Sequence, residues 1–181
     1  PILFFYLLRD LLIQKKLTFE NILFALTLGG IIPALTGIAQ WIFNAGIPIP
    51  WDIERRITGV FDYPNALGLY LGPLIVVAVA KLALPSPARE GARGWARSFW
   101  TFCAILFSIA LVLAQSEAGI AATIITIGLM GLTLPAWRKK TLVLGALACI
   151  FVLAIPASRT YLITKFTFQD RSEQVRLTQW T

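Results

Sequence analysis

The sequence predicts an all-α membrane protein, a polytopic bundle of transmembrane helices with about five full spans and a truncated first helix. Apolar residues make up 57% of the chain and charged residues only 14%, and the mean hydropathy is +0.76. A soluble globule of 181 residues needs a larger polar surface than this. The apolar residues also occur in runs close to the roughly 20 residues that a helix needs to cross a bilayer.

The first apolar run, at residues 1–8, is too short to cross a bilayer. We expect it to be the end of a truncated spanning helix, in an internal fragment of a longer protein. Residues 9–20 are a basic connection that we assign to the cytoplasm. Residues 21–46 form the first full span, with Trp41 and Phe43 at its far interface.

Residues 47–64 are then an outer loop, and residues 66–84 form the second full span. Gly68 and Gly72 are four residues apart in this span, a spacing that lets a neighbouring helix approach closely. A basic loop at 81–97 returns the chain to the cytoplasmic side. Two further spans, 98–114 and 118–136, are joined only by Gln115-Ser116-Glu117, which predicts a tight hairpin with its tip outside.

The last predicted span covers residues 141–157, after an inner connection that contains Arg138-Lys139-Lys140. Residues 158–181 are expected outside, as the start of a large periplasmic loop, and residues 1–181 as one transmembrane domain. The inner loops hold ten of the sixteen Lys and Arg residues, in agreement with the positive-inside rule. The net charge of +7 therefore implies no nucleic-acid partner.

Cys103 and Cys149 both lie in apolar runs, so we expect neither a disulfide nor a metal site from them. Asp52 and Glu54 could be imagined as metal ligands, but two acids in a flexible loop make a weak metal site. The chain contains no histidine. A mechanism that uses an imidazole base must take it from elsewhere.

The outer loop carries a cationic pair, Arg55-Arg56, shortly before the helix-start signal Pro64-Asn65. Asn65 can cap the helix that follows, and this helix directs its positive dipole end at the loop. Together these features predict an anion site at the membrane surface, suited to a phosphate group. The alternative is that the arginines anchor the helix among lipid headgroups and that Asn65 is an ordinary cap.

The other polar outer residues are expected at the depth of a lipid diphosphate in the outer headgroups, but they too have a simpler interpretation. Ser116 and Glu117 also suit an ordinary helix start, with a capping hydroxyl and an acid that complements the dipole. Glu173, Arg176 and Trp180 fall on one face of a helix, which could lie on the membrane with Trp180 in the interface.

The outer loop also resembles a known signature. In the O-antigen ligase and polymerase superfamily of bacterial inner-membrane proteins, a membrane helix follows a motif similar to Arg56-Ile57-Thr58-Gly59-Val60-Phe61 with Pro64-Asn65. The acidic and hydroxyl-rich stretch that leads to Arg176 and Trp180 looks like the family's entry into its large periplasmic loop. The order of the spans is similar, and the resemblance covers nearly the whole chain.

The resemblance implies a multi-pass glycosyltransferase that takes a glycan from undecaprenyl diphosphate and joins it to an acceptor glycolipid or protein at the periplasmic face. It implies no metal or other cofactor. Arg56 matches the motif arginine and Arg176 the arginine before the large loop, and both are expected to stabilise the diphosphate as it leaves. The residues expected to support this site are Thr58, Gly59, Asn65, Ser116, Glu117 and Trp180.

The chain departs from the family in two ways. The family often has Ser-Arg at the hairpin tip, where this chain has Ser116-Glu117 and so one cation fewer. The family's histidine, its proposed base, lies in the large loop, so no catalytic residue is expected within residues 1–181.

Two other functions stay open. Proteins described as bicarbonate transporters are similar to the same superfamily, which makes a small-anion transporter an alternative; a lipid-binding module without catalysis is another. A transporter is expected to carry ionisable or unwound polar positions at mid-membrane, and the absence of charged residues from the centres of the predicted spans disfavours it.

Overall fold

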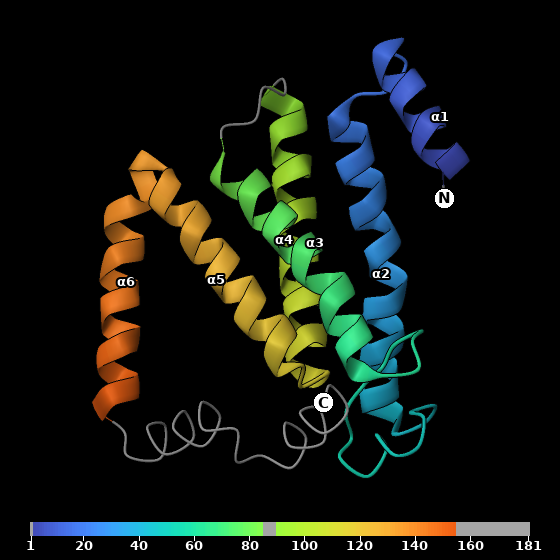
Figure 1. The fold of residues 1–181 in the computed structure, drawn as a ribbon, viewed down its shortest axis with the longest axis vertical. Helices are drawn as coiled ribbons and strands as arrows, with labels where there is room; N and C mark the ends of the chain where they lie inside the picture. The colour runs from blue at the N-terminus through green and yellow to red at the C-terminus, as the bar shows by residue number, and fades with distance from the viewer. Residues whose placement is uncertain (1, 85–89, 155–181) are drawn as a thin grey trace, which may run out of the picture. The chain divides into compact units, whose positions relative to one another are not determined.

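A computed structural model describes residues 2–84 and 90–154, and this part of the chain is all-α (Figure 1). It contains six helices and no strand: α1 (Ile2–Ile13), α2 (Phe19–Phe43), α3 (Pro64–Ala83), α4 (Glu90–Leu113), α5 (Glu117–Thr133) and α6 (Pro135–Ala154). The predicted all-α class is therefore confirmed for the described residues. The predicted periplasmic segment at 158–181, with Glu173, Arg176 and Trp180, lies outside them.

Three helical segments in the described residues are long and apolar enough to cross a membrane: Phe19–Phe43, Pro64–Ala83 and Gly94–Leu113. Their mean hydropathies are 2.1, 2.0 and 1.8. The helix α5 is apolar but has only 17 residues. The chain thus has the helices of a membrane protein, and the total of about five spans stays a prediction.

Several predicted helix ends were wrong, in each case where charged residues had been assigned to a loop. The helix α1 continues past Arg9 to Ile13, and α4 begins at Glu90, well before residue 98. The helix α6 begins at Pro135 and includes Arg138-Lys139-Lys140. A helix can continue through charges where it projects beyond the hydrocarbon layer, because only its membrane-crossing part must be apolar.

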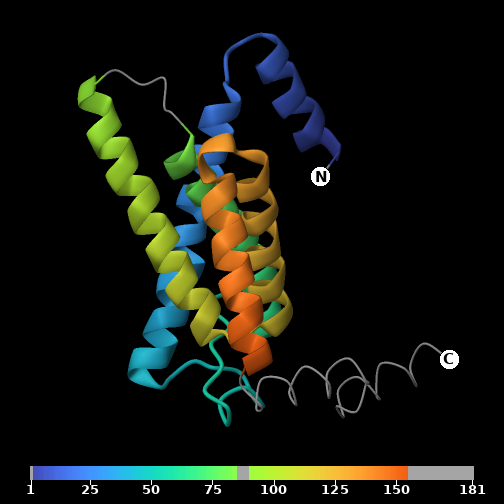
Figure 2. The ribbon, with the colours of Figure 1, turned by 90° about the vertical axis from the view of Figure 1, so that its left-hand side faces the viewer.

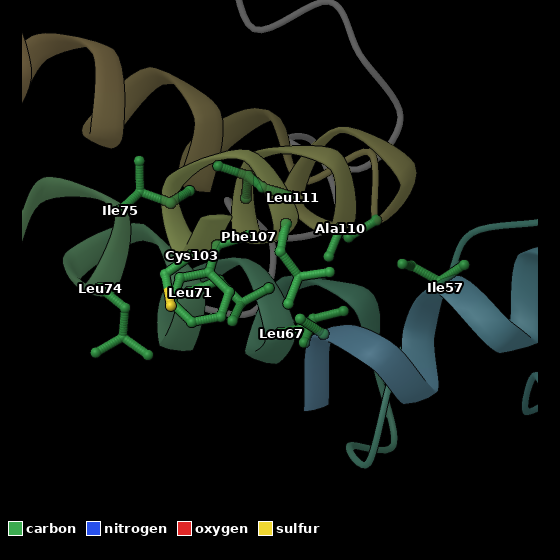
Figure 3. Close-up of a cluster of buried hydrophobic side chains, with 12 residues drawn as sticks. Ile57, Leu67, Leu71, Leu74, Ile75, Cys103, Phe107, Ala110 and Leu111 are labelled. Atoms are coloured by element: carbon green, nitrogen blue, oxygen red, sulfur yellow. The ribbon is translucent and has the colours of Figure 1, made fainter. Parts of the chain in front are cut away.

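The chain divides into two compact units, Pro1–Ile127 and Gly128–Thr181. In the first unit, α3 packs on α4, and α2 packs on both of them. Most of the core comes from residues of α3 and α4 that face each other (Figure 3). These residues are Leu67, Leu71, Leu74 and Ile75 of α3 and Cys103, Phe107, Ala110 and Leu111 of α4. In the second unit Thr141 lies against Gly131, where an added Cβ would clash with the Thr141 side chain.

The outer faces of these helices are apolar. Leu28, Ile32 and Leu35 on α2 are 49–68% exposed, and Phe102 and Ile105 on α4 are more than half exposed. Such side chains are covered by lipid chains when the helices cross a bilayer, whereas a soluble monomer rarely exposes apolar patches of this extent. The exposure pattern therefore agrees with the apolar composition of the helices.

Both ribbon views place the ends of α2 and α4 and the starts of α3 and α5 at one end of the first unit (Figures 1 and 2). At this end lie the loop between α2 and α3, residues 44–63, and the short connection between α4 and α5, residues 114–116. We call residues 44–65 and 114–117 the loop end. At the opposite end Lys81 of α3 forms an ion pair with Glu20 of α2.

Candidate functional site

The loop at the loop end is held to α2 by the side chain of Gln40. The Gln40 Oε1 accepts hydrogen bonds from the backbone N–H groups of Thr58 and Gly59, at 3.0 and 2.9 Å. The Gln40 Nε2 donates to the carbonyl oxygens of Gly46 and Gly59, at 2.8 and 3.0 Å. One carboxamide therefore fixes two points of the loop. Sequence reasoning missed Gln40, and the only available signal was an amide side chain near the end of an apolar run.

The Thr58-Gly59 turn packs tightly on α2. Gly59 has φ +62°, and a Cβ added there would lie 2.6 Å from the backbone oxygen of Pro33. Ile57 and Thr58 are fully buried, and Ile57 lies against Gly37. The turn was predicted to support an anion site. Its backbone N–H groups point to Gln40, so its contribution to such a site is to fix the position of Arg56.

Arg56 joins three segments of the chain. Its Nε donates to the Ala114 carbonyl at 3.3 Å, and its Nη2 donates to the Gln115 carbonyl at 3.2 Å and to the Asn65 Oδ1 at 3.4 Å. Its Nη1 lies 3.5 Å from the Glu54 Oε2, and the side chain is only 17% exposed. Because Ala114 and Gln115 follow the last residue of α4, the guanidinium also stabilises the negative dipole end of this helix.

Arg55 has the same relation to another helix. Its Nη2 donates to the Trp41 carbonyl in the last turn of α2 at 3.2 Å, and its guanidinium lies 5.6 Å from the centre of the Trp41 ring. The two neighbouring arginines thus bind the C-terminal ends of two different helices. Arg55 is exposed, unlike Arg56.

The predicted start of α3 is confirmed, but the predicted cap is wrong. Pro64 is the first helical residue, and the N-cap is Tyr63, without a capping hydrogen bond from its side chain. Proline favours the first helical position because its φ is preset and it has no N–H to satisfy. Asn65 therefore comes too late to cap the helix. Its side-chain oxygen accepts from Arg56 instead.

The predicted hairpin is present, and the capping interpretation of Ser116 is supported. Ser116 directly precedes α5, and its Oγ accepts from the Gly119 N–H at 3.4 Å. Its side chain is buried, and α5 then begins with Glu117, an acid in the first turn. A hydroxyl in this position is packed inside the bundle, so it does not face a ligand at the surface.

The packing interpretation of the glycine pair in α3 is also confirmed. A Cβ at Gly68 would lie 2.5 Å from the Cβ and Oγ of Ser116, and one at Gly72 would lie 2.8 Å from the Thr123 Oγ1. A Cβ at Gly119 would in turn lie 3.2 Å from the Gly68 backbone. These small residues allow α3 and α5 to approach closely.

The charge balance of the loop end does not by itself favour anions. Its acids are Asp52, Glu54, Asp62 and Glu117, and its cations are Arg55 and Arg56, so the formal charge is 2 − 4 = −2. An anion would therefore depend on one directed contact with a guanidinium, since the field of the whole loop end does not attract it. Arg176 and Trp180, the other predicted site residues, lie outside the described residues.

Comparisons with protein-family models, with curated proteins and with solved structures gave no match. The residues of the loop end therefore carry the functional inference.

Proposed function

We propose that the chain is the membrane core of a glycosyltransferase of the O-antigen ligase and polymerase type. It takes a glycan from undecaprenyl diphosphate and joins it to an acceptor glycolipid or protein, without a metal, at the periplasmic face of the bacterial inner membrane. Arg56 and Arg176 bind the diphosphate. The observation that carries the proposal is the convergence on Arg56 of the loop, the start of α3 and the α4–α5 connection.

This convergence suits the proposed chemistry because it fixes a cation in place before the substrate arrives. As the acceptor oxygen attacks the anomeric carbon, the bond to the diphosphate breaks and the leaving group gains negative charge. A preorganised guanidinium stabilises this charge without reorganising during the reaction. The proton of the acceptor hydroxyl passes to a base, which the family resemblance assigns to a histidine of the large periplasmic loop.

The proposed orientation follows from the distribution of cations. In the described part of the first unit, the end opposite the loop end carries Lys15, Lys16, Lys81 and Arg97. The loop end carries two cations, Arg55 and Arg56. The positive-inside rule then favours a cytoplasmic location for the basic end and an outer location for Arg56.

The test compares two neighbouring arginines in proteoliposomes that contain the full-length protein, an undecaprenyl-diphosphate glycan and the acceptor. Arg56→Lys keeps the charge but loses the planar group that reaches several acceptors. We expect it to lower the rate of transfer by roughly 100-fold, the lower range for losing one preorganised donor. Arg55→Lys is the matched control, and we expect its rate to stay within about twofold of wild type, since a charge near the membrane is retained.

Because Arg56 also stabilises the end of α4, both variants are compared at temperatures where each is fully folded by its thermal unfolding curve. Arg176→Lys is measured in the same way. If folded Arg56→Lys transferred glycan as fast as Arg55→Lys, Arg56 would be a structural residue only, and the diphosphate role would be wrong.

A further inference from the structure

The hydrogen bonds of Arg56 divide its guanidinium into an occupied part and an available part. A guanidinium has five N–H groups, one on Nε and two on each Nη nitrogen. The Nε group is taken by Ala114, and the two Nη2 groups are taken by Gln115 and Asn65. Within residues 2–84 and 90–154, the N–H groups on Nη1 remain, and the group that they face is the carboxylate of Glu54.

We infer that Glu54 occupies the anion position of Arg56, and that a diphosphate binds there only by displacing this carboxylate. The inference rests on the proposed function. A carboxylate and a phosphate offer a guanidinium the same kind of charged oxygen acceptors. The Nη1 of Arg56 can therefore bind the Glu54 carboxylate or a diphosphate oxygen, and the two compete.

The exposure of the two partners determines which of them moves. The side chain of Arg56 is 17% exposed and is hydrogen-bonded to three segments, whereas the side chain of Glu54 is 62% exposed. Glu54 can turn into solvent and leave the other contacts of Arg56 intact. The Trp51 ring also contacts the guanidinium, with the Arg56 Cζ 5.1 Å from the ring centre.

The competition gives the site a preference for highly charged ligands. A ligand with a single charge gains little over the carboxylate that it replaces, whereas a diphosphate carries more charge than Glu54. An ion pair at the protein surface, here with an exposed Glu54, changes an equilibrium by about 1.5- to 5-fold. Removing the Glu54 charge is expected to tighten diphosphate binding by a factor in this range, roughly threefold.

The experiment measures binding to the full chain in nanodiscs of zwitterionic lipid, with undecaprenyl diphosphate and inorganic pyrophosphate as separate probes. Glu54→Gln removes the carboxylate that faces Arg56. Asp52→Asn is the matched control, because Asp52 is an exposed acid two residues away whose Oδ1 accepts from the Ile53 N–H at 3.0 Å. An asparagine can accept the same bond, so this control removes an equal charge from the same loop without altering Arg56.

We expect Glu54→Gln to bind undecaprenyl diphosphate about threefold more tightly than wild type, and Asp52→Asn to change binding by less than about 1.5-fold. A gain with pyrophosphate as well assigns the effect to the diphosphate group, and a gain with the lipid alone assigns it to the lipid-linked form. Equal gains in both variants would overturn the inference in favour of general loop charge. If Glu54→Gln bound like wild type while wild-type binding required Arg56, the inference would fail and the proposed function would stand. Absence of binding and transfer in all variants would overturn both.

Discussion

Replacing Gln40 with methionine should release the loop from α2, because methionine is similar in length but forms no comparable hydrogen bonds. The change leaves the backbone N–H groups of Thr58 and Gly59 without their acceptor, and both residues are buried. Each unsatisfied buried amide costs about 1–3 kcal/mol. The expected loss of unfolding free energy is therefore about 2–6 kcal/mol for the pair.

Cys103 provides the assay, because its side chain is fully buried in the core between α3 and α4. A thiol-reactive fluorophore labels it only as the bundle opens, so labelling against temperature reports unfolding. The measurement uses a Cys149→Ser background, which leaves Cys103 as the single thiol. A loss of 2 kcal/mol corresponds to a fall of at least about 4 °C in a chain of this size.

A second substitution separates the roles of the two ends of the carboxamide. Gln40→Glu keeps oxygens that accept from Thr58 and Gly59, but it sets a carboxylate beside the Gly46 and Gly59 carbonyls. We expect this variant to be destabilised at neutral pH and to recover as the pH falls, because protonation of the introduced carboxyl restores a donor. If the unfolding temperature of Gln40→Met stayed within about 1 °C of the wild-type value, the reasoning that Gln40 fixes the loop would be refuted.

Two further predictions concern glycines and use the same thiol assay. Gly59→Ala should lower the unfolding temperature, because a residue at φ +62° costs roughly 1–2 kcal/mol and its Cβ would meet the Pro33 backbone oxygen at 2.6 Å; an unchanged temperature would show that the turn can relax away from α2. Gly68→Ala should also destabilise, because its Cβ would lie 2.5 Å from Ser116. Gly94→Ala in α4 is the control for a helical glycine of the same unit, since no described atom lies within 4 Å of its Cβ position, and helix propensity predicts that it stabilises by up to about 1 kcal/mol. Equal effects at Gly68 and Gly94 would contradict close packing of α3 on α5.

The sequence was sufficient to predict the features that depend on local signals. The start of α3 follows from Pro64, and the tight turn between α4 and α5 follows from a connection too short for anything else. The predicted cap of α3, Asn65, was wrong, although Pro64 itself carried the needed information. A proline at the first helical position makes the preceding residue, Tyr63, the N-cap.

The features that the sequence could not show depend on contacts distant in the chain. Gln40 meets Thr58 and Gly59, which are 18 and 19 residues further along. Arg56 meets Ala114 and Gln115, which are 58 and 59 residues away. No periodicity or spacing predicts which polar groups such a fold brings together. The predictions of helix ends were wrong for another reason. Hydropathy indicates the membrane-crossing part of a helix, but it does not indicate where the helix itself ends.

The cationic pair Arg55-Arg56 was one of the features that predicted an anion site. The structure supplies each arginine with partners of partial negative charge from the protein itself, since Arg55 and Arg56 bind the carbonyl ends of α2 and α4. Their presence in the loop between α2 and α3 is therefore not by itself a sign of substrate binding. What distinguishes the two is that Arg56 is largely buried, tied to three segments, and directs its Nη1 at an exposed carboxylate. A fixed cation whose remaining donors face a displaceable acid is suited to exchange that acid for a phosphate oxygen, and this difference makes Arg56 rather than Arg55 the residue on which the proposed function depends.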